Sequence, residues 1–287
     1  MAQTDNSASA PQTLDIRPVA GALGAEISGV DLSRDLSDET VTDIRQALLN
    51  HQVIFFRDQD ITPDQHLAFA KRFGETVEYP LVKGLEGYPE IMTVVKLENE
   101  KLNFGGLWHS DMSYVEEPPM GSILVARELP PYGGDTIFAN MYLAYEMLSD
   151  GMKKLLEPLK GVSVSNLPKV VATRKERFKA GAKVESETVL TATHPVIRTH
   201  PETGRKLLYV NGAHTIRFEG MSDEECAPLL EYLFEHQTRP EFTCRFVWEP
   251  GSIVFWDNRS TQHNPVNDYH GYKRVMHRIT LAGDRPA

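Results

Sequence analysis

Cysteine is scarce in this sequence, with only Cys226 and Cys244 among 287 residues. Two cysteines are too few for a disulfide scaffold, and their spacing matches no metal-binding motif. Such low usage is typical of proteins from a reducing compartment. We therefore expect two free thiols and a cytoplasmic location.

Long apolar runs and an excess of positive charge are also absent. No uninterrupted apolar stretch approaches the roughly 20 residues that a membrane-spanning helix requires, and the first residues do not have the pattern of a secretory signal. The 40 acidic residues outnumber the 30 basic ones, which gives a formal net charge of −10. This balance argues against a broad nucleic-acid-binding surface. We expect a soluble protein that binds neither membrane nor nucleic acid.

No internal repeat and no low-complexity linker divides the chain. Residues 1–13 are mostly polar or small, a composition typical of a disordered tail. Residues 14–287 have an ordinary globular composition, and β-rich proteins of this length can form one unit. The sequence therefore predicts one domain after a short disordered segment.

Hydrophobic periodicity and capping residues predict four helical stretches. The clearest begins at Ser222, where Glu225 three residues later completes a capping box. Another begins at Thr62, an N-cap followed by proline at the first helical position. The predicted stretches are 40–49, with Ser37 as N-cap, 63–73, 141–159 and 221–237.

Most of the remaining pattern is typical of strands. Short strands and turns are expected over 14–32, and the compact apolar run 52–58 indicates a buried strand. Further strands are predicted at 90–97, 121–128, 135–141, 194–200, 206–212, 242–249, 252–258 and 275–283. Helices and strands do not alternate regularly, which disfavours a parallel αβ fold. We predict a mainly β fold with helices, a jelly-roll-like double sheet with helical decoration.

Two histidines and an aspartate form a candidate metal site, the metal triad: His109, Asp111 and His263. On an extended segment, residues two apart project from the same face, so His109 and Asp111 can reach one point. Such a set leaves coordination positions open for Fe(II), a chelating co-substrate and O2. It also suits catalytic zinc. His-x-Asp pairs are common by chance, so spacing alone leaves these alternatives open.

A pair of arginines lies on the last predicted strand. Strand periodicity places Arg274 and Arg278 on one face with Met276 between them. Two arginines inside a barrel are costly unless anionic groups compensate them, and a dicarboxylate such as 2-oxoglutarate supplies those groups. The alternative is a pair of surface arginines on an edge strand.

Several blocks of sequence occur together in one order: GVDL, HQVIFFRDQDITPDQHLAFAKRFGE, WHSDMSY, PPYGGDTIFANM, RTHPETGRKLLYVN, WDNRSTQH and KRVMHRITLAGDRP. On these blocks the chain from Leu14 to Pro286 resembles the taurine dioxygenase and phenoxyacetate-herbicide dioxygenase family of Fe(II)/2-oxoglutarate enzymes. The resemblance implies a double-stranded β-helix, which is a jelly roll. Related enzymes are often dimers or tetramers, so a homo-oligomer is expected.

The resemblance also implies residue roles. The metal triad matches the family's iron ligands. Thr136 matches the threonine that hydrogen-bonds a carboxylate of 2-oxoglutarate, and Arg274 the arginine that pairs with its distal carboxylate. Arg278 matches the arginine that approaches the anionic group of the primary substrate or the inner end of the co-substrate.

Four positions depart from the taurine enzymes. Tyr79 and Val82 stand where those enzymes carry a histidine and a tyrosine for the sulfonate and amine. Gly105 replaces an asparagine, and His214 replaces a phenylalanine of the pocket. Taurine is therefore not the expected substrate. His214 either contacts a substrate carboxylate or packs at the rim.

The pattern weakens over 163–193, where the resemblance places a variable active-site loop. Long irregular loops are often lids, so an active-site lid is predicted. A solvated charged loop is the alternative. The bases that could attract an anionic substrate here are Lys169, Arg174, Lys175, Arg177, Lys179 and Lys183.

The predicted activity is Fe(II)/2-oxoglutarate-dependent hydroxylation of a small anionic substrate by O2. Candidate substrates are aryloxyalkanoates, alkyl sulfates, sulfonates and related carboxylates. Hydroxylation beside oxygen or sulfur would cleave a C–O or C–S bond. Two other functions are considered, a zinc hydrolase that uses the same triad and a non-enzymatic small-molecule sensor. The zinc alternative leaves Thr136 and Arg274 without a function.

Overall fold

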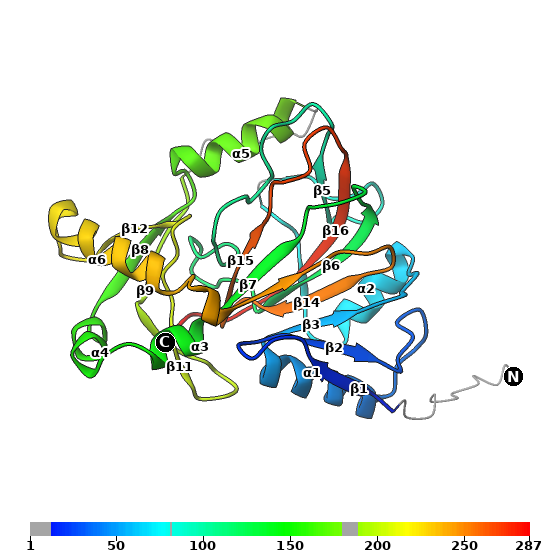
Figure 1. Ribbon diagram of the computed structural model, residues 1–287, viewed down its shortest axis with the longest axis horizontal. Helices are drawn as coiled ribbons and strands as arrows, with labels where there is room; N and C mark the ends of the chain where they lie inside the picture. Colours follow the sequence, from blue (N-terminus) through cyan, green and yellow to red (C-terminus); the bar gives the residue numbers. More distant parts are fainter. Residues whose placement is uncertain (1–12, 81, 180–188) are drawn as a thin grey trace, which may run out of the picture.

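The computed structural model describes residues 13–80, 82–179 and 189–287, so the predicted disordered tail lies outside them except for Thr13 (Figure 1). The described part is mainly β. Its helices are α1 (Asp38–His51), α2 (Pro63–Lys71), α3 (Met141–Glu146), α4 (Asp150–Leu156), α5 (Pro168–Lys179), α6 (Asp223–His236) and the 3-10 helix η1 (Pro240–Phe242).

The strands are short and most pairs are antiparallel. In chain order they are β1 (Asp15–Pro18), β2 (Ala25–Ser28), β3 (Val53–Phe56), β4 (Thr76–Val77), β5 (Ile91–Lys96), β6 (Gly121–Glu128), β7 (Thr136–Asn140), β8 (Lys160–Val164), β9 (Thr191–Pro195), β10 (Ile197–Thr199), β11 (Lys206–Leu208), β12 (Thr215–Phe218), β13 (Thr243–Phe246), β14 (Ile253–Asp257), β15 (Thr261–Pro265) and β16 (Arg274–Leu281).

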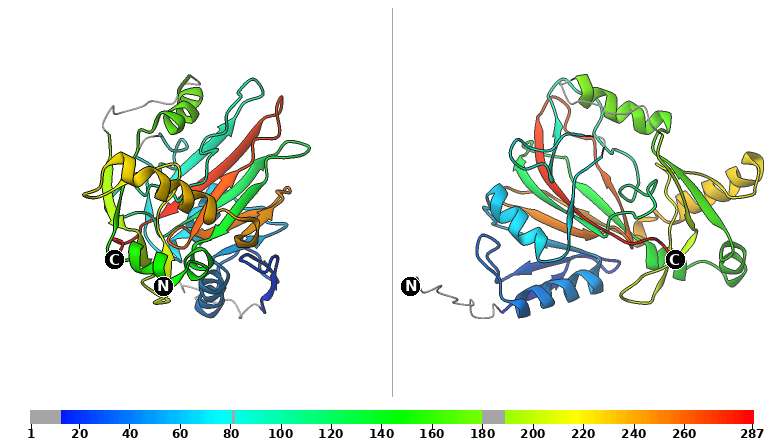
Figure 2. Two further views of the ribbon diagram at one scale, coloured as in Figure 1. Left: turned by 60° about the vertical axis from the view of Figure 1, so that its left-hand side comes forward. Right: turned by 180° about the vertical axis from the view of Figure 1, so that it is seen from behind.

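Two sheets form the centre of the molecule. The larger has the order β1-β2-β3-β14-β6-β16-β4, with β5 also paired to β16, and the smaller has the order β13-β7-β15. Strands far apart in sequence are therefore neighbours, as where β14 lies between β3 and β6. Helices α1 and α2 pack on the larger sheet, while α5 lies at the opposite end of the molecule from α1 (Figures 1 and 2).

The apolar run VIFF of β3 is buried because both of its faces are covered. Ile54 and Phe56 join a core with residues of α1 and α2. Val53 and Phe55 point the other way, into a core shared with Phe138 of the smaller sheet. A strand buried on both faces has a continuous rather than an alternating apolar pattern, which is why the sequence predicts it well.

The predicted helix starts are confirmed. Ser37, Thr62 and Ser222 are N-caps whose hydroxyl oxygens accept backbone N–H groups, and the capping box between Ser222 and Glu225 is complete. The predicted stretch 141–159 is not continuous, because Ser149 acts as a new N-cap and separates α3 from α4.

Two other local predictions need correction. The segment 163–193 is not an irregular loop throughout, since it contains the end of β8, helix α5 and the start of β9; residues 180–188 lie outside the described part. The polar run TQHNP forms β15, which the sequence did not predict. No described helix is long and apolar enough to cross a membrane.

Replacement of Ser222 by alanine should lower the free energy of unfolding by about 1 kcal/mol, because the first turn of α6 loses a side-chain acceptor. Urea denaturation followed by circular dichroism measures this loss. Ser222→Asp keeps an acceptor and should be close to wild type. Equal losses in both variants would contradict a capping role.

Candidate active site

The metal triad is brought together by backbone pairing between distant segments. His109 precedes β6 and His263 lies within β15, and their backbones exchange hydrogen bonds of 3.1 and 2.8 Å. His109 Nε2 is 3.6 Å from Asp111 Oδ1, and the imidazole centroids are 4.2 Å apart. The potential ligand atoms of all three side chains lie within 4.8 Å of one another. Two histidines and one carboxylate at this separation can hold a divalent metal ion.

Hydrogen bonds orient the ligands. His109 Nδ1 lies 2.7 Å from the carbonyl oxygen of Leu107, which therefore accepts its proton and leaves Nε2 directed to the metal position. The Asp111 backbone is clamped by Asn258, whose Oδ1 accepts from its N–H at 2.6 Å and whose Nδ2 donates to its carbonyl at 3.0 Å. Ser122 donates to Asp111 Oδ2 at 3.1 Å. Asn258 therefore fixes the backbone of Asp111, and Ser122 fixes one oxygen of its carboxylate.

Charge sets the protonation of the triad. Burial alone would raise the pKa of Asp111, but Arg278, whose Nη1 donates to Oδ1 at 2.9 Å, holds that pKa well below its usual range. Burial, with His109 alongside, lowers the pKa of His263 well below its usual value. An anionic carboxylate and a neutral imidazole are the states that a metal ion requires.

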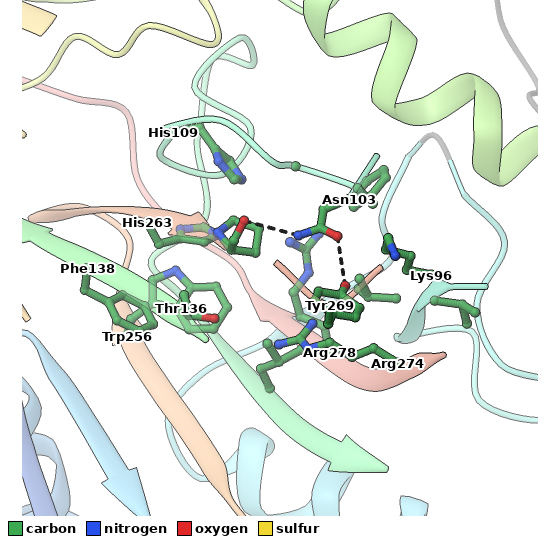
Figure 3. A pocket seen from close by; sticks show the side chains of 16 residues that line it. Lys96, Asn103, His109, Thr136, Phe138, Trp256, His263, Tyr269, Arg274 and Arg278 are labelled. Carbon is green, nitrogen blue, oxygen red and sulfur yellow. Dashed lines mark hydrogen bonds between the residues drawn. The ribbon is translucent and has the colours of Figure 1, made fainter. Parts of the chain in front are cut away.

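A cavity between the sheets, the co-substrate cavity, extends from the triad histidines to Arg274 and Lys96 (Figure 3). Arg274 is 5% exposed, and its Nε and Nη2 have no hydrogen-bond partner. Thr136 Oγ1 accepts from Trp248 Nε1 at 3.0 Å, so its own proton is left for another acceptor. The guanidinium of Arg274 lies 5.4 Å from the Trp248 ring. A buried guanidinium with two free nitrogens, in the same cavity as a hydroxyl donor, fits a carboxylate ligand.

A second cavity borders His109 and Asp111; we call it the substrate cavity because it contains residues that the sequence predicts to contact the substrate. Predicted pocket residues Tyr79, Gly105 and His214 line it. Its other lining residues are mostly apolar: Phe104, Leu107, Met112, Tyr114, Val170, Thr173 and Ala213. Val82 does not line it and instead borders a separate hollow whose lining also includes Glu78, Tyr79, Lys83 and Leu85.

Gly105 borders both cavities and lies against a metal ligand. Its φ is +71°, and a Cβ there would be 3.1 Å from Cε1 of His109. A side chain would therefore be strained by the backbone and would press on the imidazole. Any side chain at this position would therefore require the His109 ring to shift by a few tenths of an ångström.

A triad of this composition next to a cavity lined by two buried arginines is typical of one class, the non-haem iron oxygenases that use a 2-oxo acid. Comparison with known proteins identifies the group within it. The chain belongs to the taurine catabolism dioxygenase TauD, TfdA family, whose model matches residues 15–280. It is an Fe(II)/2-oxoglutarate-dependent dioxygenase, and neither a zinc hydrolase nor a sensor is supported.

Similar proteins include an alpha-ketoglutarate-dependent sulfate ester dioxygenase of Pseudomonas putida, 39% identical over 97% of this chain and 93% of that protein. An alkylsulfatase of Acinetobacter baylyi is 41% identical over 95% and 86%. Among solved structures, a putative alpha-ketoglutarate-dependent taurine dioxygenase of Burkholderia xenovorans has a TM-score of 0.83 and 38% identity, covering 96% of this chain and 94% of that one. AAD-2 with Mn(II) and N-oxalylglycine has a TM-score of 0.77 at 31% identity, covering 96% and 99%.

Three supporting residues were not found from the sequence. Asn258 and Ser122 position Asp111, and Trp248 holds Thr136. Asn258 lies within the WDNRSTQH block, so the family resemblance could have pointed to it. The contacts of Ser122 and Trp248 depend on the register between strands that are distant in sequence, which no local sequence pattern predicts.

Gly105→Ala should weaken metal binding by about tenfold, because displacing one ligand imidazole removes on the order of 1.4 kcal/mol. Titration with Mn(II), followed by calorimetry, measures this. Gly204→Ala is the matched control, since Gly204 has a similar φ of +68° and no atom near its Cβ position. Equal affinity in all three proteins would contradict the steric argument.

Arg274→Ala should raise the KM for 2-oxoglutarate by about 10- to 100-fold, because a charged hydrogen-bonded contact contributes roughly 1.5–3 kcal/mol. Turnover at saturating co-substrate should change much less. Succinate formation at varied 2-oxoglutarate gives both values. An unchanged co-substrate requirement would remove Arg274 from this role.

Proposed function

We propose that this dioxygenase oxidises small alkyl sulfate esters at the carbon that bears the ester oxygen. The observation that carries the proposal is the substrate cavity, whose walls are mainly apolar and which also contains Tyr79 and His214 beside the triad residues His109 and Asp111. Such a cavity fits a short carbon chain with one anionic end. The sulfate ester dioxygenase and the alkylsulfatase, at 39% and 41% identity, support this substrate class.

Within this proposal the metal triad holds Fe(II). The distal carboxylate of 2-oxoglutarate pairs with Arg274 and accepts a hydrogen bond from Thr136, while its 2-oxo acid end faces the triad. The unpaired Nε and Nη2 of Arg274 support this orientation. So does the similarity to a structure that contains Mn(II) and N-oxalylglycine.

The sulfate group is proposed to bind where Arg278, Tyr79 and His214 approach the triad. The guanidinium of Arg278 lies 5.2 Å from the Tyr79 ring, and its Nε has no hydrogen-bond partner. The His214 ring lies 6.3 Å from the His109 ring. A sulfate bound here would hold the first carbon of the ester close to the metal position.

When bound, iron, 2-oxoglutarate and O2 supply an oxidant that replaces a substrate C–H by C–OH, with release of succinate and CO2. The chain's residues hold the ester carbon in position and exclude water from the two cavities. A carbon that carries both a hydroxyl and a sulfate ester breaks its C–O bond to the sulfate. The products are then an aldehyde and hydrogen sulfate.

We also propose that the two facing sheets form a double-stranded β-helix and that residues 14–287 form one domain. The core that contains Phe138 and Phe246 of the smaller sheet and Phe55 and Trp256 of the larger one supports this. Val170 and Thr173 of α5 line the substrate cavity, which supports a lid function for this part of 163–193. A cytoplasmic homo-oligomer remains proposed, and the two free, buried cysteines suit that compartment.

Aryloxyalkanoates are the second candidate. A (S)-phenoxypropionate/alpha-ketoglutarate-dioxygenase of Sphingobium herbicidovorans is 31% identical over 94% of this chain and 95% of that protein. The aromatic wall formed by Tyr114 and His214, with ring centroids 4.8 Å apart, would suit an aryl group.

Hexyl sulfate should yield succinate, sulfate and hexanal in equal amounts with purified protein, Fe(II), 2-oxoglutarate and O2. Its kcat/KM should exceed that of taurine by about 100-fold, because the described lining of the cavity outside the metal triad contains no carboxylate to pair with the taurine ammonium. Coupled assays for succinate and sulfate measure both. His109→Ala is the control without turnover, and faster turnover of phenoxypropionate would favour the second candidate.

A further inference from the structure

A lysine inside the co-substrate cavity has no function in the mechanism above. Lys96 is the last residue of β5 and is only 3% exposed, yet its Nζ has no hydrogen-bond partner. A buried ammonium without an anionic partner is costly. Its presence indicates that something else compensates the charge when the enzyme works.

The sheet register places Lys96 beside Arg274. The two residues are direct partners in the antiparallel pair of β5 and β16, so their side chains share a face. Along the same pair, Met92 lies opposite Arg278. Since Arg278 contacts Asp111, the order along β16 puts Lys96 at the end of the cavity away from the metal. Figure 3 shows the same arrangement, with the two triad histidines on one side and Lys96 on the other.

The surroundings of Lys96 hold it in place without neutralising it. Its Nζ lies 4.4 Å from the centroid of the Tyr269 ring, and Tyr269 is fixed by a 2.8 Å hydrogen bond to Asn103. The nearby carboxylate of Glu100 accepts the Leu97 N–H at 2.6 Å and only partly opposes the lowering of the Lys96 pKa by burial. A cation–π contact contributes about 0.5–2 kcal/mol, too little to offset burial of the charge beside a second cation.

We propose that Lys96 and Arg274 together bind the distal carboxylate of 2-oxoglutarate, and that Lys96 sets the preference for a dicarboxylate. The inference rests on the proposed binding orientation of the co-substrate. A carboxylate has two oxygens and about four acceptor sites, enough for a guanidinium, an ammonium and the Thr136 hydroxyl. The primary substrate is not the partner, because Lys96 lines only the co-substrate cavity.

The test compares wild type with Lys96→Met, which keeps the length of the side chain and removes its charge. Anaerobic Fe(II) protein is titrated with 2-oxoglutarate, and the visible charge-transfer band of the chelate gives Kd. The titration is repeated with 2-oxopentanoate, which has the same chain without the distal carboxylate. Lys96→Met should raise Kd for 2-oxoglutarate about tenfold and leave that for 2-oxopentanoate unchanged.

Thermal unfolding of the metal-free protein provides an independent measurement. Loss of an uncompensated buried cation beside Arg274 should raise Tm in Lys96→Met. Lys96→Arg should restore the preference for 2-oxoglutarate. The exposed Lys101→Met, with the same change of charge, should alter neither quantity.

Two results would overturn the inference. A lower Tm with an unchanged ratio of the two Kd values would make Lys96 a structural residue that covers Tyr269. An equal rise in both Kd values would show a general distortion of the cavity. If wild type itself gives no band with 2-oxoglutarate, the proposed binding orientation fails instead.

Discussion

The short backbone pairing between His109 and His263 is the interaction on which the rest of the site depends. It joins a segment that belongs to no long strand to the edge of the smaller sheet. Through it the centroids of the two imidazoles come to 4.2 Å from each other. Asp111 lies two residues after His109, and the Asn258 side chain hydrogen-bonds both its backbone N–H and its carbonyl. Main-chain pairing therefore brings the metal ligands together, and side-chain hydrogen bonds then orient them. Rigid placement of ligands is what a catalytic metal site requires.

The co-substrate cavity carries more positive than negative charge. Arg278 is balanced by Asp111, while the guanidinium of Arg274 retains two nitrogens, Nε and Nη2, that have no hydrogen-bond partner among the described residues. While the cavity is empty, its buried positive charge destabilises the folded protein, because the charge has lost its hydration. A bound dianion offsets this desolvation penalty. Folding stability and co-substrate affinity are thus opposed at the same side chains, as is common where a protein prepares a site for a ligand.

The sequence predicted those parts of the molecule in which burial follows hydrophobicity. The strand 121–128 coincides with β6, and the caps Ser37, Thr62 and Ser222 begin helices as expected. It failed where polar residues are buried for function. The run TQHNP has no apolar period, yet it forms β15 through pairing with β7. The metal triad was indicated by residue type and by family resemblance, whereas Trp248 beside Thr136 depends on long-range register that local patterns do not encode.

Helix α5 contributes to one cavity and not to the other. Val170 and Thr173 line the substrate cavity, and no described residue of α5 lines the co-substrate cavity. Under the proposed function, substitutions in this helix would change the shape of the cavity that receives the substrate and would leave the residues of the co-substrate cavity unchanged. Related proteins with this architecture would then differ in substrate specificity through one peripheral helix, while the metal ligands and the co-substrate contacts stay the same.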